Sequence, residues 1–193
     1  MNNLKTLLIF IFFTVTFVGS AQIYTEKEIS IAINKSKKDS VSKIERLAAL
    51  KFHNIINKYR LKHHLDSLHW SESLWITTRN HSVWMAETDK LSHTQTKKNN
   101  YFTGRKIQDR IKYVTNINSK INLLGENVLY NSDISGSTIN KIAYNIASIA
   151  FKEWKNSSDH NRNMLTKNFT THGVAFIIKD DLFWATDVFF LSE

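Results

Sequence analysis

The chain has no cysteine and no proline, and only five of its 193 residues are glycine. Without cysteine there are no disulfides, so the folded part must be stabilised by its hydrophobic core. We attribute the absence of proline, beside abundant lysine, asparagine and isoleucine, to genome composition rather than to mechanism. Acidic residues are also scarce: 17 Asp and Glu stand against 26 Lys and Arg, a formal net charge of +9.

The excess positive charge is spread along the chain rather than gathered in a motif. It occurs as short groups such as Lys97-Lys98, Arg105-Lys106 and Arg110. No aromatic-and-basic module typical of nucleic-acid-binding domains accompanies it. Nucleic acid is therefore not an expected partner. A diffuse cationic surface favours anionic envelopes or polymers, and the alternative is a face that only keeps the protein soluble.

Residues 1–21 have the pattern of a cleavable export signal. Lys5 is followed through Val18 by an almost unbroken apolar run, and the small residues Gly19-Ser20-Ala21 close the segment. Cleavage after Ala21 would leave 172 residues with a net charge of +8, enough for one domain with a real core. A retained N-terminal anchor is the alternative, although the run falls short of the ~20 apolar residues of a comfortable transmembrane helix. We expect a secreted, extracytoplasmic protein with no transmembrane segment in the mature chain.

The remaining sequence predicts a polar arm at 22–43 and one domain at 44–193. Hydrophobic periodicity predicts helices at 41–61, 71–90 and 137–157, a helical turn at 107–113, and strands at 123–131, 173–179 and 182–191. Helices first and strands closing the chain favour an α+β layered fold. The expected core includes four tryptophans, Trp70, Trp84, Trp154 and Trp184.

Six segments, in this order, resemble one known family. They are Phe52-His53-Asn54 to Tyr59-Arg60 with Leu68 and Trp70; Leu91-Ser92-His93; Gly125-Glu126-Asn127; Trp154-x-x-Ser157-x-x-His160-x-x-Asn163-Met164-Leu165; His172-Gly173-Val174-Ala175; and Asp187-Val188-Phe189-Phe190. This pattern resembles the CAP superfamily of cysteine-rich secretory proteins, antigen 5 and pathogenesis-related 1 proteins, in its disulfide-free bacterial branch. The resemblance covers about residues 47–190.

The resemblance implies an α-β-α sandwich, with three main helices around a small, mostly antiparallel sheet. It also implies a central cleft lined by two histidines and two glutamates, which can hold a divalent cation, often zinc. The matched positions here are His93, Glu126 and His160. The second glutamate falls on Ser157, so the fourth position departs from the family pattern. Glu153, one helical turn before Ser157, is a nearby carboxylate but not the matched one.

Each candidate also has a plainer interpretation. Two neutral imidazoles are good zinc ligands, and Glu126 could orient one of them or act as a base. Alternatively, His93 caps the end of helix 71–90, and Glu126 only pins its loop. His172 is expected to be structural, and Asn127 and Asn163 to satisfy loop backbone groups. The histidines without a motif are expected on helix faces or at the surface: His53, His63, His64, His69 and His81.

Two classes of function follow from these candidates. The first is an extracellular binding module whose cleft takes a small apolar, lipid-like or peptide ligand, or a cell-surface partner. The second is a zinc-assisted, peptidase-like hydrolase with His93 and His160 on the metal and Glu126 as base. The missing second glutamate favours binding. A purely structural role at the cell surface fits the basic arm but has no motif.

Overall fold

The computed structural model describes residues 40–96, 99–115 and 123–191. The predicted export signal and nearly all of the predicted arm lie outside these residues. The last four residues of that arm, 40–43, form the first turn of a helix. None of the helices in the described part is long and apolar enough to span a membrane.

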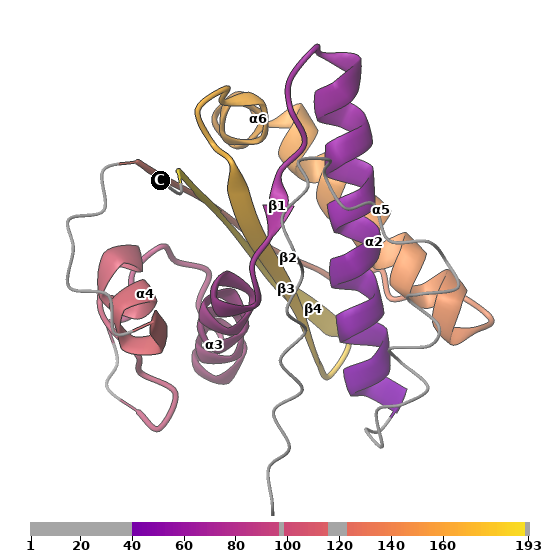
Figure 1. The fold of residues 1–193 in the computed structure, drawn as a ribbon. Coiled ribbons are helices and arrows are strands. Elements are labelled where there is room, and N and C mark those ends of the chain that lie inside the picture. Colours follow the sequence, from indigo (N-terminus) through magenta and orange to yellow (C-terminus); the bar gives the residue numbers. More distant parts are fainter. Residues whose placement is uncertain (1–39, 97–98, 116–122, 192–193) are drawn as a thin grey trace, which may run out of the picture.

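Two helical layers enclose one sheet (Figure 1). The helices α2 (Ser40–Lys62), α5 (Ile139–Asn156) and α6 (Ser158–Leu165) lie on one side of it, and α3 (Glu72–Thr88) and α4 (Ile107–Thr115) on the other. The sheet has the order β1-β3-β4-β2, with β1 (His69–Trp70), β2 (Leu124–Asn131), β3 (Thr171–Lys179) and β4 (Leu182–Phe190). The α+β sandwich is therefore confirmed, and its sheet is antiparallel except where β1 pairs with β3.

Strands β3 and β4 form a hairpin with a two-residue loop, since Lys179 pairs with Leu182. Asp180 takes the left-handed conformation, with φ of 54°. Such hairpin loops require positive φ, which Asp tolerates better than most residues other than glycine. The turn predicted at 179–181 is thus confirmed without the favoured Asn-Gly pair.

The larger part of the core lies between α2, α5 and the sheet. Phe52 packs edge-on against both Trp154 and Phe176, with ring centroids 5.2 and 6.1 Å apart. Across the sheet, Trp84 and Trp184 fill a second cluster beneath α3. Three of the four tryptophans expected in the core, Trp84, Trp154 and Trp184, are buried, the first and last in this second cluster.

Trp70 differs from that expectation because it is only half-buried. It belongs to the two-residue strand β1 at the edge of the sheet, which was not predicted from the sequence. Its indole N–H donates to Glu72 Oε1 at 2.9 Å, and the Arg46 guanidinium lies 5.1 Å from its ring. A position at the sheet edge lets the ring pack while its polar atom keeps a charged partner.

Helix α3 begins and ends close to the predicted residues. Ser71 is the N-cap, and its hydroxyl accepts a hydrogen bond from the Leu74 N–H at 3.2 Å. The C-cap is Asp89, which has φ of 49° and whose N–H donates to the Met85 carbonyl.

The helix predicted at 137–157 is confirmed as α5, Ile139–Asn156, and a second, short helix follows it directly. Ser157 has an extended backbone, with φ of −92° and ψ of 122°, and it both ends α5 and begins α6. The short helix α6 was not predicted as a separate element. It turns the chain back toward β2 and carries His160.

Strand β2 forms one edge of the sheet, and two side chains bind its backbone carbonyls. Asn163 Nδ2 of α6 donates to the Glu126 carbonyl at 3.3 Å, and Trp154 Nε1 of α5 donates to the Val128 carbonyl at 3.4 Å. These contacts fix α6 and the end of α5 against β2.

A chain of polar side chains crosses the core from α2 to β4. His53 Nδ1 lies 2.7 Å from His172 Nε2, and His172 Nδ1 lies 2.9 Å from Asp187 Oδ1. All three residues are buried. The structural interpretation of His172 is confirmed, whereas the expectation of a helix-face or surface position for His53 is wrong, because its ring hydrogen-bonds to the sheet.

Candidate functional site at the start of β2

Glu126 is the centre of a cluster formed at the start of β2, where α3, α4 and α6 converge. Its side chain is only 7 % exposed, and both carboxylate oxygens have partners. His93 Nδ1 lies 2.9 Å from Oε1, and Arg110 Nη2 forms a charge-assisted hydrogen bond to Oε2. We call His93, Glu126, Arg110 and His160 the His–Glu site.

His93 lies in the loop after α3, and its side chain is 55 % exposed. An ionised carboxylate only accepts hydrogen bonds, so Nδ1 of His93 must donate to Glu126. In the neutral ring Nε2 then keeps the lone pair that can bind a metal or a ligand proton. The alternative prediction that His93 caps the preceding helix is wrong, because α3 ends at Thr88 and Asp89 is its cap.

Arg110 was not predicted as a site residue, because in the sequence it is only one of the dispersed positive charges. It is buried on α4, and its Nη1 also donates to the carbonyls of His93 and Arg105, at 3.1 and 3.3 Å. One guanidinium thus holds both the carboxylate and the loop that carries His93. The available signal was its spacing: Arg110 follows Ile107 by three residues, which places it on the inward face of that helix.

His81 supports the same loop from α3. Its Nε2 lies 2.8 Å from the Ser92 carbonyl, and Gln95 Nε2 donates to its Nδ1 at 3.2 Å. Burial lowers the pKa of His81 to about 4, so the ring is neutral at pH 7. The expectation of a helix-face or surface position is wrong for this residue too, because it is fully buried beneath the loop.

His160 lies on α6 and is half-buried. Burial, together with the positive charge that His93 can carry, lowers the pKa of His160. Asn127 Nδ2 donates to the His160 carbonyl at 3.1 Å, and Asn127 Oδ1 accepts from Asn163 Nδ2 at 2.8 Å. The expected backbone-binding roles of both asparagines are confirmed.

Gly125 allows this close approach of α6 to β2. A Cβ added there would lie 3.0 Å from Asn163 Oδ1 and 3.1 Å from the Phe169 ring. The Gly-Glu-Asn segment therefore divides three tasks. Gly125 provides space for α6, Glu126 binds His93 and Arg110, and Asn127 anchors the backbone of His160.

Ser157 and Glu153, the other two predicted site residues, are placed differently. Ser157 is half-buried at the junction of α5 and α6, and its hydroxyl does not cap α6. Glu153 is exposed on α5. Within the described residues, neither side chain has a hydrogen bond to His93, Glu126 or Arg110.

The donor set suits a weakly held cation. His93 and His160 offer two imidazoles, and Glu126 orients one of them from behind, as carboxylates do around zinc-binding histidines. The described part of the chain has no group of three or more His, Asp or Glu side chains arranged to hold a metal ion. Any metal bound here would therefore complete its coordination with water or a ligand.

Comparison with known sequences decides the family. Residues 53–186 match the sequence pattern of the cysteine-rich secretory protein family, CAP. The chain belongs to the CAP family. No curated protein matches it at a significant level.

Solved structures share the CAP fold at low sequence identity. An extracellular SCP-domain protein of Bacillus anthracis has a TM-score of 0.60 and 22% identity over 79% of this chain, which spans only 43% of that protein. An outer surface protein of Borrelia burgdorferi has a TM-score of 0.54 and 17% identity over 73% of this chain and 90% of its own length. A cysteine-rich secretory protein of Staphylococcus aureus has a TM-score of 0.50 and 11% identity, over 77% of this chain and 40% of that one.

Proposed function

We propose that this CAP domain is an extracytoplasmic binding module whose ligand site is the His–Glu site, and that His93 and His160 hold a divalent cation there. The observation that carries the proposal is the bond between His93 Nδ1 and Glu126 Oε1, at 2.9 Å. It fixes the tautomer of the exposed imidazole and leaves Nε2 to bind. Imidazole donors favour zinc or another transition metal over calcium or magnesium.

The charges around the site favour modest affinity. Arg110 already neutralises Glu126, and Ser157 stands where the family pattern has a second glutamate. A dication would therefore meet no unpaired carboxylate among these residues. Water or an anionic group of a ligand would balance its charge, which suits reversible binding.

Hydrolysis has less support than binding. A general base needs an accessible lone pair and a pKa near the working pH. Burial raises the pKa of Glu126, but the hydrogen bond from His93 and the charge of Arg110 outweigh burial and lower it overall. With both oxygens engaged, Glu126 is better suited to orient His93 than to take a proton from water.

Location and ligand class rest on the sequence. The pattern at 1–21 supports export, and the family resemblance supports a small apolar, lipid-like or peptide ligand, or a cell-surface partner. The dispersed positive charge gives no support to a nucleic-acid ligand.

Zinc titration calorimetry tests the site directly. We expect His93→Ala and His160→Ala each to weaken zinc binding by about 100-fold or more, because one imidazole alone leaves too few donors. Glu126→Gln should weaken it by about 10–100-fold, as loss of an orienting carboxylate does. Ser157→Glu should tighten zinc binding.

The zinc affinity should fall as the pH drops below about 6.5, because protonated imidazole does not bind metal.

The matched control is the double variant His63→Ala/His64→Ala, at exposed positions where α2 ends. Its zinc affinity should equal that of the wild type. Loss of binding in this control, or full binding in His93→Ala/His160→Ala, would place the metal elsewhere and refute the proposal. Circular dichroism of each variant shows whether the fold is retained.

A further inference from the structure

The outer side of α5 carries a stripe of lysines. Ala143, Ile146, Ala147, Ala150 and Trp154 are its buried residues. Lys141, Tyr144, Ser148, Lys152 and Lys155 follow one another at three- and four-residue steps on the opposite side. The three lysines are exposed, and Tyr144 is 55 % exposed. At ~1.5 Å per residue the stripe is ~20 Å long.

The C-terminal half of α2 extends this surface. Lys58 and Lys62 are exposed one turn apart. Between them and α5 lies Tyr59, whose ring meets Phe151 edge-on at 5.1 Å and lies 5.4 Å from the Lys155 ammonium. We call this surface the lysine face: Lys58 and Lys62 of α2, and Lys141, Tyr144, Lys152 and Lys155 of α5.

The charge of the lysine face is of one sign. Glu153 is the exposed carboxylate of α5, but it lies about a third of a turn from the line of the lysines. Helix α3 in the opposite layer exposes charges of both signs, Glu72, Arg79 and Glu87. The positive charge of the lysine face is therefore more than an ordinary mixed surface requires for solubility.

We infer that the lysine face binds the surface of an anionic lipid bilayer. Exposed lysines in a row attract the negative surface potential of such a membrane, and their long alkyl stems allow the ammonium groups to reach the headgroups. Tyr144 stands in the same row, and an amphipathic ring of this kind favours the headgroup level. An extended soluble polyanion would bind the lysines but would not require the exposed ring of Tyr144.

This orientation leaves the α3–α4 side of the His–Glu site uncovered, whereas His160 of α6 belongs to the same helical layer as the lysine face. Arg110 belongs to α4. Helices α3 and α4 lie on the other side of the sheet from α2 and α5 (Figure 1). A domain lying on a membrane through α2 and α5 therefore presents the α3–α4 layer to the surroundings. The inference does not depend on metal binding.

Co-sedimentation with lipid vesicles tests the inference, using protein recovered from the extracytoplasmic fraction. Vesicles of phosphatidylcholine alone are compared with vesicles containing 30 % phosphatidylglycerol, a composition of about one anionic lipid in three. We expect binding only to the anionic vesicles, falling as salt rises from about 0.05 to 0.5 M. Equal binding to both kinds of vesicle would show apolar insertion and overturn the inference.

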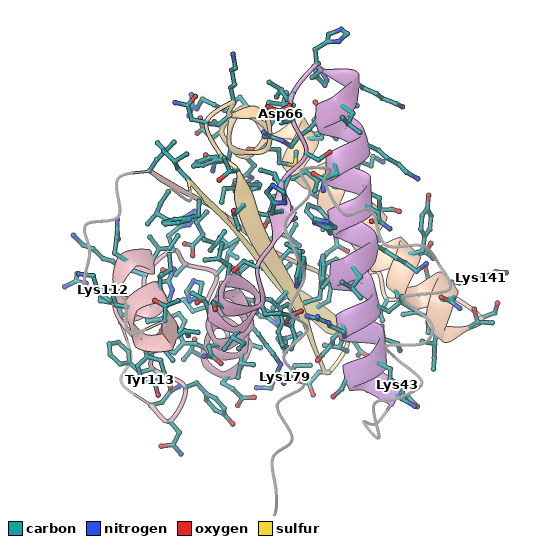
Figure 2. The ribbon with its side chains drawn as sticks, in the orientation of Figure 1. Lys43, Asp66, Lys112, Tyr113, Lys141 and Lys179 are labelled. Carbon is teal, nitrogen blue, oxygen red and sulfur yellow. The ribbon has the colours of Figure 1, made fainter. Side chains whose placement is uncertain are left out.

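Paired variants locate the surface. Each lysine near an anionic membrane contributes about fivefold to partitioning, so Lys141→Gln/Lys152→Gln should reduce binding by about 25-fold. The control Lys106→Gln/Lys112→Gln removes the same charge from exposed positions in and beside α4. Lys112 and Lys141 lie on opposite sides of the molecule (Figure 2). The control should lose less than about threefold on this argument.

Three further outcomes decide the matter. An equal loss in both double variants would mean that net charge alone drives binding, which overturns the lysine face. Binding to soluble polyphosphate but not to anionic vesicles would assign the face to a polymer and overturn the membrane. Tyr144→Ser should weaken vesicle binding while leaving any polyphosphate binding unchanged, and the reverse result would count against a bilayer.

Discussion

At the scale of single residues, the buried histidines have a defined proton arrangement. Asn57 accepts from the Leu68 N–H through Oδ1 and donates to the Leu68 carbonyl through Nδ2, which fixes its amide. The same Nδ2 lies 3.3 Å from His53 Nε2, so that nitrogen accepts. His53 therefore donates through Nδ1 to His172, and His172 donates through Nδ1 to Asp187.

The consequence is a neutral His172 deep in the core. Burial, with a smaller contribution from the charge of Arg60, lowers the pKa of His172 to about 3. Burial also raises the pKa of Asp187 well above its usual range. A proton added to His172 would place a positive charge in a fully buried site, at a high cost.

We predict that the protein loses stability on mild acidification. His172 and His81 have folded pKa values of about 3 and about 4, below the ordinary 6.5 that they regain on unfolding. Their stabilisation is fully present above pH 6.5 and is lost as the pH falls toward those values. Each contributes a slope of up to about 1.4 kcal/mol per pH unit. The raised pKa of Asp187 acts in the opposite sense, so we expect a net loss of about 1–3 kcal/mol per unit.

Urea unfolding followed by tryptophan fluorescence, from pH 7.5 to 4.5, measures this slope. His81→Gln should flatten it by about 1.4 kcal/mol per pH unit, because one proton-linked group is removed. A free energy of unfolding that stays constant between pH 7 and 5 would contradict the prediction.

At the scale of elements, Arg60 joins the end of α2 to the segment after α6. Its guanidinium is fully buried and donates to four carbonyls, those of Asp66, Met164, Thr166 and Phe169. These bonds tie the first helix to the segments that follow it and that follow α6. No carboxylate takes part in these four bonds; the backbone alone binds the charge.

We predict that Arg60→Met destabilises the protein by about 3–5 kcal/mol, because buried carbonyls lose their donors. Arg60→Lys should recover little of this loss, since one ammonium cannot reproduce a planar fork of donors. The matched control is Arg162→Met on α6, whose partner Asp159 is as exposed as Arg162 itself. It should change the free energy of unfolding by less than about 1 kcal/mol. Equal effects of the two Arg→Met changes would contradict the assigned role of Arg60.

The sequence predicted elements well where the signal is local. Helix α2 differs from its prediction by one residue at each end, because its apolar stripe lies within the helix. Strand β1 and helix α6 were not predicted, because each depends on distant partners. The former pairs with β3, and the latter is held by Asn127 of β2.

The candidate site shows the same contrast between residues marked by local motifs and residues whose role depends on tertiary contacts. His93, Glu126 and His160 were named because family motifs mark them, and one hydrogen bond joins His93 to Glu126. Arg110 and His81 belong to no motif. Their importance comes from burial beside the His93 loop, which only the packing of α3 and α4 reveals. For the same reason, the deep burial of His53 could not be read from its position on α2.

At the scale of the whole molecule, Trp154 connects three elements. It is fully buried, meets Phe52 of α2 at 5.2 Å with the rings nearly perpendicular, and binds the Val128 carbonyl of β2. We predict that Trp154→Ala costs about 3–5 kcal/mol, through lost contacts and the cavity left behind. Chemical denaturation measures this cost. The control is Trp70→Ala at the half-buried edge position, which should lower the free energy of unfolding clearly less. A loss below about 1 kcal/mol for Trp154→Ala would place that ring outside the core.

The bonds from Asn163 and Trp154 to the carbonyls of β2 also limit self-association. An exposed edge strand offers its free backbone groups to any extended chain, including another copy of the same protein. Here the Glu126 and Val128 carbonyls are already bound by side chains of α6 and α5. At the opposite edge, β1 is only two residues long. A second copy would have to break both bonds before it could extend the sheet through β2, so the contacts that position His160 also protect the folded chain from aggregation along that edge.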